Sequence, residues 1–308
     1  MGLVWLTVLA LTVAAPAGSA KRTVAVLTAI KGKVELKRAG EREFKRLTST
    51  TMLTSGDEVR LAPGATAALL REDSAPALLR GGRTVSIAAT GARPAASGAT
   101  VKLQRISDVL TSTERTAPMT VRNDAEAEPP LLLLAPRYSK ELTGLPEFRW
   151  KQIEGARSYT LKLLDANEDP VMPPMKTTET SAKLPEARRL KPGTYIAEVT
   201  TDDRSGRRLF DTARFTVAGA DEAQSIRQSL DAARKLALPA CAPNVPLCVA
   251  LIESGQFAEA ETLLVAATKD LPEDKTLHLL LADLYRRTKL EHRQLRALKA
   301  AGVEPVAK

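Results

Sequence analysis

The hydrophobic positions of this chain follow different periods along its length, after an apolar start that carries no charge. Residues 1–20 contain no charged side chain, and the apolar run over residues 3–15 has the length of the hydrophobic region of a signal peptide. Small residues end this run and precede Lys21 and Arg22. The pattern predicts a cleavable signal peptide over residues 1–20 and a periplasmic or secreted mature chain. An uncleaved N-terminal anchor is the alternative.

Strand periodicity follows in residues 21–90. Apolar or small side chains occupy every second position from Val24 to Leu36, and Gly32 falls where we expect one strand to end and the next to begin. Short apolar segments then alternate with turn signals, which include Gly56-Asp57 and Pro63-Gly64. We expect positive φ at Gly56 and Gly64, because only glycine adopts it cheaply, and we expect Asp57 to cap its turn. The segment predicts a compact all-β unit.

The stretches IKGKVELKRAGEREFKRL, LTSGDEVRLAPGATAALL and GGRTVSI resemble a FecR-type extracytoplasmic domain. The pattern of that family falls here on Gly32/Val34, Gly56/Asp57, Gly64/Ala67/Leu69 and residues 84–87. The resemblance implies the fold and a general binding role. In the best-known members the domain is the envelope part of a membrane-crossing regulator of a sigma factor. The cytoplasmic segment of that arrangement does not precede the hydrophobic stretch here, so we do not expect sigma-factor regulation.

Residues 91–130 are rich in Ala, Thr, Ser and Gly and are predicted to form a linker with a short helix near residues 101–110. Residues 131–218 return to strand-length apolar segments separated by Gly, Pro or charged turns, which predicts a β-sandwich of about seven strands. Phe148 and Trp150 alternate and are both expected in its core. The alternative for Trp150 is a stacking surface for a ligand.

A second turn motif lies in residues 190–195. Pro192 fixes φ, Gly193 is expected to supply a left-handed turn, and the Tyr195 hydroxyl is expected to bond back to the preceding backbone. The stretches FRWKQIEGARSYTLKLLD and LKPGTY resemble a fibronectin type III or immunoglobulin-like module. That resemblance implies the fold and a role as a spacer or a protein-contact surface.

Helical periodicity replaces the strands in residues 219–308. Residues 221–236 predict an amphipathic helix, and helices are expected to resume near Pro246. A spaced set follows, consisting of Gly255, Phe257, Ala260, Leu264, Ala267 and Pro272. Gly255 permits a tight turn between helices, Phe257 seats that turn, the alanines allow close helix crossing, and Pro272 ends a helix.

This spacing resembles a tetratricopeptide repeat, whose period is about 34 residues. One good repeat is followed by a poor one, marked by Leu281, Ala282 and Tyr285. An array this short is expected to dock on the sandwich or to bind another protein, because solenoid repeats bury their faces against neighbours. The predicted fold class is therefore multidomain, β then α: a small all-β FecR-like domain, an Ig/fibronectin-III-like sandwich and C-terminal TPR-like helical hairpins.

The net charge of +9 lies mainly in the two predicted β modules, with +6 in residues 21–90 and +3 in residues 131–218. Excess charge keeps an exported protein soluble, and that is the favoured interpretation. The alternative is binding of an anionic wall polymer or glycan by the basic FecR-like domain. Aromatic residues make up only 4% of the chain, which argues against stacking surfaces for sugars or nucleic-acid bases. Nucleic acid is not an expected partner.

The two cysteines, Cys241 and Cys248, predict a local disulfide worth about 2–3 kcal/mol, with two buried free thiols as the alternative. His278 and His292 are too far apart in sequence to share a helical face at metal-ligand spacing. No metal or cofactor is expected. Asp202-Asp203 could suggest a carboxylate-pair hydrolase, but TTDDRSGRR is typical of a hairpin turn.

No catalytic motif can be assembled from these residues. The sequence therefore favours a non-catalytic exported envelope protein that acts as a protein–protein interaction scaffold. Its expected partner is another envelope protein, and no transmembrane span is expected after signal cleavage. The alternative is a cell-wall or glycan-binding protein.

Overall fold

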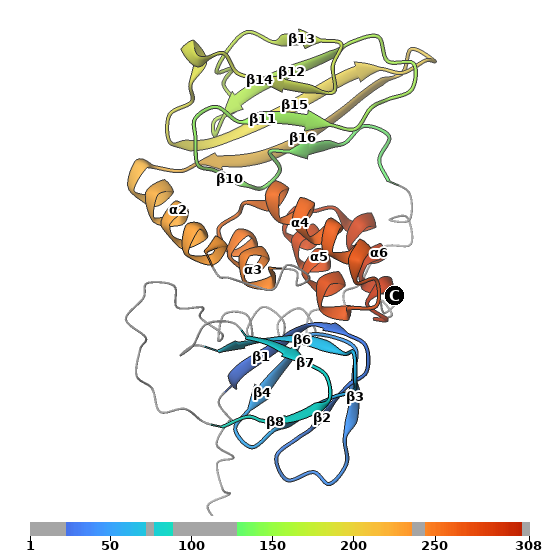
Figure 1. Ribbon diagram of the computed structural model, residues 1–308. Helices are drawn as coiled ribbons and strands as arrows, with labels where there is room; N and C mark the ends of the chain where they lie inside the picture. The colour runs from blue at the N-terminus through green and yellow to red at the C-terminus, as the bar shows by residue number, and fades with distance from the viewer. Residues whose placement is uncertain (1–22, 72–76, 89–127, 236–243, 304–308) are drawn as a thin grey trace, which may run out of the picture.

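Two bodies of β-structure precede a set of helices in the computed structural model, which describes residues 23–71, 77–88, 128–235 and 244–303 (Figure 1). The predicted order of β then α is confirmed. We call residues 21–90 the first module, residues 131–218 the second module and residues 219–308 the third module. The predicted signal peptide, the candidate helix near residues 101–110 and Cys241 lie outside the described residues.

The first module consists of two four-stranded antiparallel sheets with the orders β4-β1-β6-β7 and β3-β2-β5-β8. Its strands are β1 (Thr23–Lys31), β2 (Val34–Lys37), β3 (Lys45–Leu47), β4 (Thr51–Thr54), β5 (Glu58–Leu61), β6 (Thr66–Arg71), β7 (Ala77–Arg80) and β8 (Arg83–Ser86). The facing sides of the sheets form a core that includes Leu27, Val34 and Leu69.

Turn glycines separate these strands as the sequence predicted. Gly32 ends β1 with a φ of +81°, Gly56 has a φ of +88° and Gly64 a φ of +78°. Gly32 is also restricted by packing, because a Cβ there would lie 3.1 Å from Ala65. The predicted breaks are therefore confirmed at all three glycines.

The second module packs a five-stranded sheet, β10-β16-β15-β12-β13, against a three-stranded sheet, β14-β11-β9. The strands are β9 (Leu133–Ala135), β10 (Lys140–Glu141), β11 (Glu147–Trp150), β12 (Tyr159–Asp165), β13 (Met175–Thr177), β14 (Ser181–Lys183), β15 (Gly193–Asp202) and β16 (Arg208–Val217), with the 3-10 helix η2 (Glu186–Arg188) before β15. Alternation on β12, β15 and β16 directs one face inward, where Phe148 and Phe215 meet edge to face at 5.8 Å. The result is a β-sandwich.

Short strands escaped the sequence prediction. Strands β10, β13 and β14 show no apolar alternation. Each has only two or three residues and lies at the edge of its sheet. Hydrogen bonding to a neighbour, rather than burial, defines such strands.

The third module contains α2 (Ala220–Arg234), α3 (Val245–Glu253), α4 (Phe257–Asp270), α5 (Lys275–Arg287) and α6 (Glu291–Ala300). Asn244 caps α3 through a hydrogen bond from the N–H of Leu247 at 3.0 Å, and Pro246 occupies its first turn. Asp274 caps α5 in the same way, accepting from Thr276 N–H at 2.9 Å. None of the described helices is long and apolar enough to cross a membrane.

The helices lie between the two β modules in space, although they come last in the sequence (Figure 1). Their hydrophobic core includes Val26 and Leu70 from the first module and reaches Leu132, just before β9. The third module therefore shares buried surface with both others. The expectation that so short a helical array docks on the sandwich is met.

Candidate functional site

The Gly-Asp turn of the first module has a structural role. Asp57 is fully buried, and its carboxylate accepts hydrogen bonds from the N–H groups of Thr54 and Ala39 at 2.8 and 2.9 Å and from Arg38 Nη1 at 2.8 Å. Burial opposes ionisation, but these hydrogen bonds and the Arg38 charge outweigh it and lower the pKa of Asp57. The turn is capped as expected, and this carboxylate is fully engaged.

The tyrosine motif of the second module also serves the fold. Tyr195 Oη donates to the Lys191 carbonyl at 2.9 Å, which is the predicted backward hydrogen bond. Gly193 has a positive φ of +155°, which favours glycine, but this value at the start of β15 is not that of the expected left-handed turn. Pro192 lies exposed before that strand.

Trp150 fills the sandwich core and is not a ligand platform. Only 3% of its surface is exposed, and its ring centroid lies 5.5 Å from that of Tyr159. Phe148 is fully buried in the same core, as the alternation predicted.

Cys248 is a buried free thiol on α3. Burial raises its pKa to about 12, so it is not a ready nucleophile at neutral pH. The predicted disulfide with Cys241 is therefore not formed in this structure, although Cys241 itself lies outside the described residues.

The helical motif residues lie in and around the α3–α4 hairpin. Gly255 joins α3 to α4 with a φ of +77°, and Phe257, Ala260 and Ala267 are buried along α4. Pro272 is exposed just after α4 ends. These residues determine helix packing and carry no chemistry.

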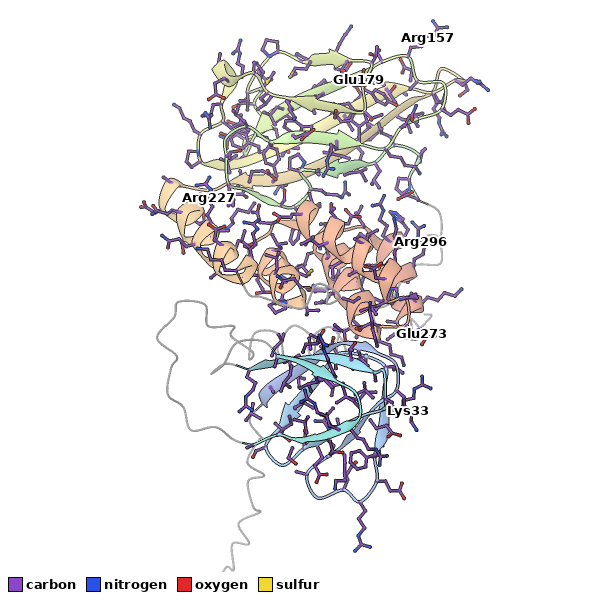
Figure 2. All side chains as sticks on the ribbon, viewed as in Figure 1. Lys33, Arg157, Glu179, Arg227, Glu273 and Arg296 are labelled. Carbon is purple, nitrogen blue, oxygen red and sulfur yellow. The ribbon has the colours of Figure 1, made fainter. Side chains whose placement is uncertain are left out.

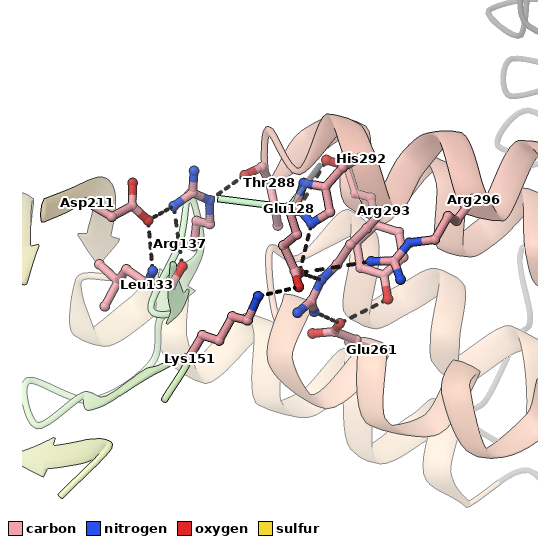
Figure 3. Close-up of polar contacts among 11 residues, drawn as sticks. Glu128, Leu133, Arg137, Lys151, Asp211, Glu261, Thr288, His292, Arg293 and Arg296 are labelled. Atoms are coloured by element: carbon pink, nitrogen blue, oxygen red, sulfur yellow. Dashed lines mark hydrogen bonds and ion pairs between the residues drawn. The ribbon is translucent and has the colours of Figure 1, made fainter. Parts of the chain in front are cut away.

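The largest polar cluster joins the second module to the third, and its centre is Glu128 (Figure 3). Its carboxylate lies 3.0 Å from Lys151 Nζ, 2.9 Å from Arg293 Nε and 2.8 Å from His292 Nε2. Burial opposes ionisation, yet the hydrogen bonds from Lys151, Arg293 and His292 prevail and lower the pKa of Glu128 to about 2. Glu128 therefore links Lys151, directly after β11, to α6 as a carboxylate that is ionised at neutral pH. Glu128 belongs to residues 91–130, which were predicted to form a linker, so this end of the predicted linker contacts both neighbouring modules.

Arg137 forms the second polar link of this junction (Figure 3). The side chain is 91% buried, and its Nε donates to the Thr288 carbonyl, between α5 and α6, at 2.8 Å. Its Nη1 lies 2.9 Å from Asp211 Oδ2, and the same oxygen accepts from Leu133 N–H at 2.7 Å. One guanidinium thus joins β9, β16 and the turn between two helices.

The third link uses backbone groups of β10 and of the α3–α4 turn. Lys140 N–H donates to the Gly255 carbonyl at 3.1 Å, and the Gln256 side chain donates to the Lys140 carbonyl. A Cβ at Gly255 would lie 3.1 Å from Lys140 Cβ and 3.2 Å from its nitrogen. Glycine is therefore required at position 255 for two reasons: the turn needs a positive φ, and the turn packs closely against Lys140 of β10.

Beside these links runs an open groove of about 510 Å³ between the end of the sandwich and α2. Leu190, Val217 and Ala223 are buried in its floor, and its rim includes Arg189, Gln224 and Arg227. Leu190 and Pro192 of the predicted turn motif line it. Its volume falls in the range of ligand-binding sites.

Several ionisable groups of the described residues make structural contacts. The described residues include no set of three or more His, Cys, Asp or Glu side chains placed to hold a metal. Burial raises the pKa values of Glu141 and Asp274, but Glu141 accepts from Ser139 Oγ at 2.8 Å and Asp274 caps α5. Asp202 and Asp203 lie at the β15–β16 hairpin, as expected.

Sequence reasoning missed the junction residues. Glu128 is one of three acids in RNDAEAEPP, and nothing in that stretch distinguishes it from Asp124 or Glu126. Arg137 did carry a signal, because a single arginine directly after the apolar run LLLLAP is a candidate for burial.

Comparisons with known proteins assign no family. No family model and no curated protein matches the chain. Similar solved structures include CopC from Methylosinus trichosporium OB3b, with 16% identity over 28% of this chain and 92% of that one and a TM-score of 0.21. A tetra-tandem repeat from the extending region of a large adhesion protein has 14% identity, covers 64% of this chain and has a TM-score of 0.22. Chicken CNTN1 FN1-FN3 domains have 12% identity, cover 62% of this chain and have a TM-score of 0.18.

The chain spans 42% of the adhesion-protein structure and 56% of the CNTN1 structure. At these TM-scores none of the three similarities supports a functional argument.

Proposed function

We propose that this protein is a non-catalytic, exported scaffold of the cell envelope that binds other proteins. One observation carries the proposal: the third module is held between two β modules by specific contacts, and these contacts build a groove that no single module contains. Its strongly perturbed charged groups, Glu128 and Asp57, are engaged in holding the structure together. A rigid arrangement of modules is what a scaffold needs to present surfaces at fixed spacing.

The parts proposed for this scaffold are a FecR-like first module, an Ig/fibronectin-III-like second module and a TPR-like third module. The two-sheet first module with its Gly-Asp turn supports the first assignment. The tyrosine hydrogen bond of Tyr195 supports the second. Two helical hairpins, α3–α4 and α5–α6, support the third. Export and cleavage of residues 1–20 belong to the same proposal.

The test is quantitative capture from envelope fractions with the full-length mature chain as bait. We expect specific proteins to be enriched above a bait-free control, and enrichment to fall when Arg137→Met loosens the module arrangement. Recovery of no protein above background from cross-linked envelopes would count against a scaffold.

A second candidate function is binding of an anionic wall polymer by the first module. It is favoured by the outer face of the β3-β2-β5-β8 sheet, which points away from the helices and carries Lys37, Arg46 and Arg60 (Figure 1). Two of these cations already pair with carboxylates, Lys37 with Glu58 at 2.9 Å and Arg60 with Glu35 at 2.7 Å, which reduces the charge available to a polymer. Salt-sensitive sedimentation with isolated cell wall, lost on removal of residues 21–90, is the expected result if this function holds.

A further inference from the structure

We infer that the groove between the second module and α2 is a docking site for an extended, acidic peptide segment of a partner protein. The inference rests on the proposed scaffold function and names the site and the chemistry of the partner. Figure 2 shows Arg227 on α2 where that helix meets the sandwich.

The charge of the groove carries the inference. Two arginines line it from opposite sides, Arg189 from the loop before β15 and Arg227 from α2, and none of its described lining residues is acidic. Arg189 pairs with Glu186, but both side chains are more than half exposed, and such a pair is easily exchanged for a ligand carboxylate. Arginine recognises carboxylates through two parallel N–H donors.

Arg227 retains donors for a ligand. Its Nη2 donates to the Leu142 carbonyl, which ties α2 to the loop after β10. Within the described residues its Nε and Nη1 make no hydrogen bond, so the three N–H groups of these two nitrogens remain available to a ligand. The bond to Leu142 also restrains the side chain, which reduces the entropy lost on binding.

Aliphatic residues lie at the bottom of the groove, although little of their surface is exposed. Leu190 and Val217 are buried beneath the opening, and Ala223 keeps the α2 wall low. A peptide that alternates acidic and aliphatic side chains can place its carboxylates on the arginines and its aliphatic groups on this floor. An acyl chain would need an enclosed apolar tunnel, whereas this groove is open along its length.

The walls of the groove are already in place without a ligand. Leu190 N–H donates to the Gly144 carbonyl at 2.8 Å, which joins the two sandwich loops. A Cβ at Gly144 would lie 2.3 Å from the Leu190 carbonyl oxygen, so only glycine allows this contact. The site therefore needs no rearrangement to accept a segment.

The test is fluorescence polarisation with the full chain and a labelled pentapeptide, Glu-Leu-Glu-Val-Glu with a free carboxyl terminus. We expect a dissociation constant below about 1 mM, and binding at least about tenfold weaker for the double variant Arg189→Gln/Arg227→Gln. The matched control is Arg157→Gln, an equal charge change at an exposed site at the far end of the sandwich (Figure 2). It should leave binding within about twofold.

Two further variants and a neutral peptide separate the contributions of charge, guanidinium geometry and access to the groove. Arg227→Lys keeps the charge but loses the paired N–H donors, so it should bind the peptide more weakly than the wild type and more tightly than the double variant. Gln224→Trp keeps both arginines but blocks the opening and should abolish binding. The peptide Gln-Leu-Gln-Val-Gln with an amidated terminus should bind at least about tenfold more weakly. Unchanged unfolding midpoints will show that each variant is folded.

The inference is overturned if the wild type does not bind the acidic peptide, if the neutral peptide binds equally, or if the double variant matches Arg157→Gln. Arginine-dependent binding to phosphatidylglycerol vesicles in place of the peptide would assign the groove to lipid and overturn it as well. If the double variant captures the same envelope proteins as the wild type, the scaffold stands and this groove is not its docking site. If the peptide binds as expected but no envelope protein is captured, the groove stands and the scaffold does not.

Discussion

The third module meets its two neighbours through contacts of opposite chemistry. Toward the first module the contact is mainly apolar: Val26 and Leu70 are almost fully buried in the helical core. Thr50 adds two polar contacts, because its carbonyl accepts from Thr276 Oγ1 at 3.4 Å and its N–H donates to the Asp274 carboxylate. Toward the second module the contact is polar and centres on Glu128 and Arg137.

The two contacts have different consequences: one mainly stabilises the arrangement of the modules, and the other fixes their orientation. Apolar burial is roughly proportional to area and has little directional preference, so the first contact mainly supplies stability. Hydrogen bonds to a planar guanidinium or a carboxylate depend on angle, so the second contact fixes how the sandwich sits on the helices. The groove lies on the oriented side, where its shape can be maintained.

The largest expected effect is in the apolar contact. Leu70→Ala removes a side chain that is 1% exposed and leaves a cavity between β6 and the helices, which should lower the free energy of unfolding by about 2–5 kcal/mol. Urea denaturation followed by circular dichroism measures it. Phe210→Ala is the control, since Phe210 is 69% exposed and its loss should change the free energy by less than about 0.5 kcal/mol. Equal effects of the two changes would refute the buried contact.

Arg137→Met should have the next largest effect, about 3 kcal/mol, because it leaves Asp211 and the Thr288 carbonyl without their partner. The same denaturation experiment measures the loss. Hydrogen exchange should show faster opening at the α5–α6 turn and unchanged protection in β1 and β6. If β1 and β6 lose protection equally, the two contacts are not separable.

Gly255→Ala tests the approach of α3–α4 to β10. A positive φ costs a non-glycine residue about 1 kcal/mol or more, and the added Cβ also meets Lys140 at 3.1 Å. Gly206→Ala is a matched control, because Gly206 has a φ of +81° with no atom within 4 Å of its added Cβ. We expect Gly255→Ala to be more destabilising than the control by about 1–2 kcal/mol in thermal unfolding. Equal losses of stability in the two variants would mean that β10 shifts to accommodate the added Cβ without cost.

The smallest effect concerns the charge of Glu128. Its pKa is lowered from 4.5 to about 2, so its stabilising contribution is present above pH 4.5 and is lost as the pH falls toward 2. Burial and the nearby arginines lower the pKa of His292, although Glu128 opposes this shift, so protonation of His292 below about pH 6.5 should weaken the same junction. Glu128→Gln should therefore destabilise by about 1–2 kcal/mol at pH 7, with the difference from wild type vanishing near pH 2.

A pH series of denaturation curves measures this difference. Glu222→Gln is the control, since the Glu222–Lys140 pair is well exposed and should contribute less than about 0.5 kcal/mol at any pH. A difference for Glu128→Gln that stays constant from pH 7 to pH 3 would contradict the ionic origin of the link.

Part of the apolar contact could be seen in the sequence. The segment Ala67-Ala68-Leu69-Leu70 is continuously apolar, and all four residues are buried on β6. A strand with apolar side chains on both faces needs both faces covered. Here the facing sheet of the first module covers one face of β6 and the helices cover the other. The groove could not be seen this way, because Arg189 and Arg227 lie in separate modules and each reads alone as a surface charge.

Local patterns alone determined the order of β and helical parts, the turns at Gly32, Gly56 and Gly64, the tyrosine hydrogen bond and the helix boundaries near Pro246 and Pro272. Each of these depends on residues close in the chain, whose backbone preferences and spacing are readable directly. Only the tertiary structure decided that the last module lies in the middle, that Glu128 and Arg137 link it to the sandwich, and that two distant arginines share a groove. These contacts join residues far apart in sequence, and no periodicity within a segment encodes which distant charge it will meet.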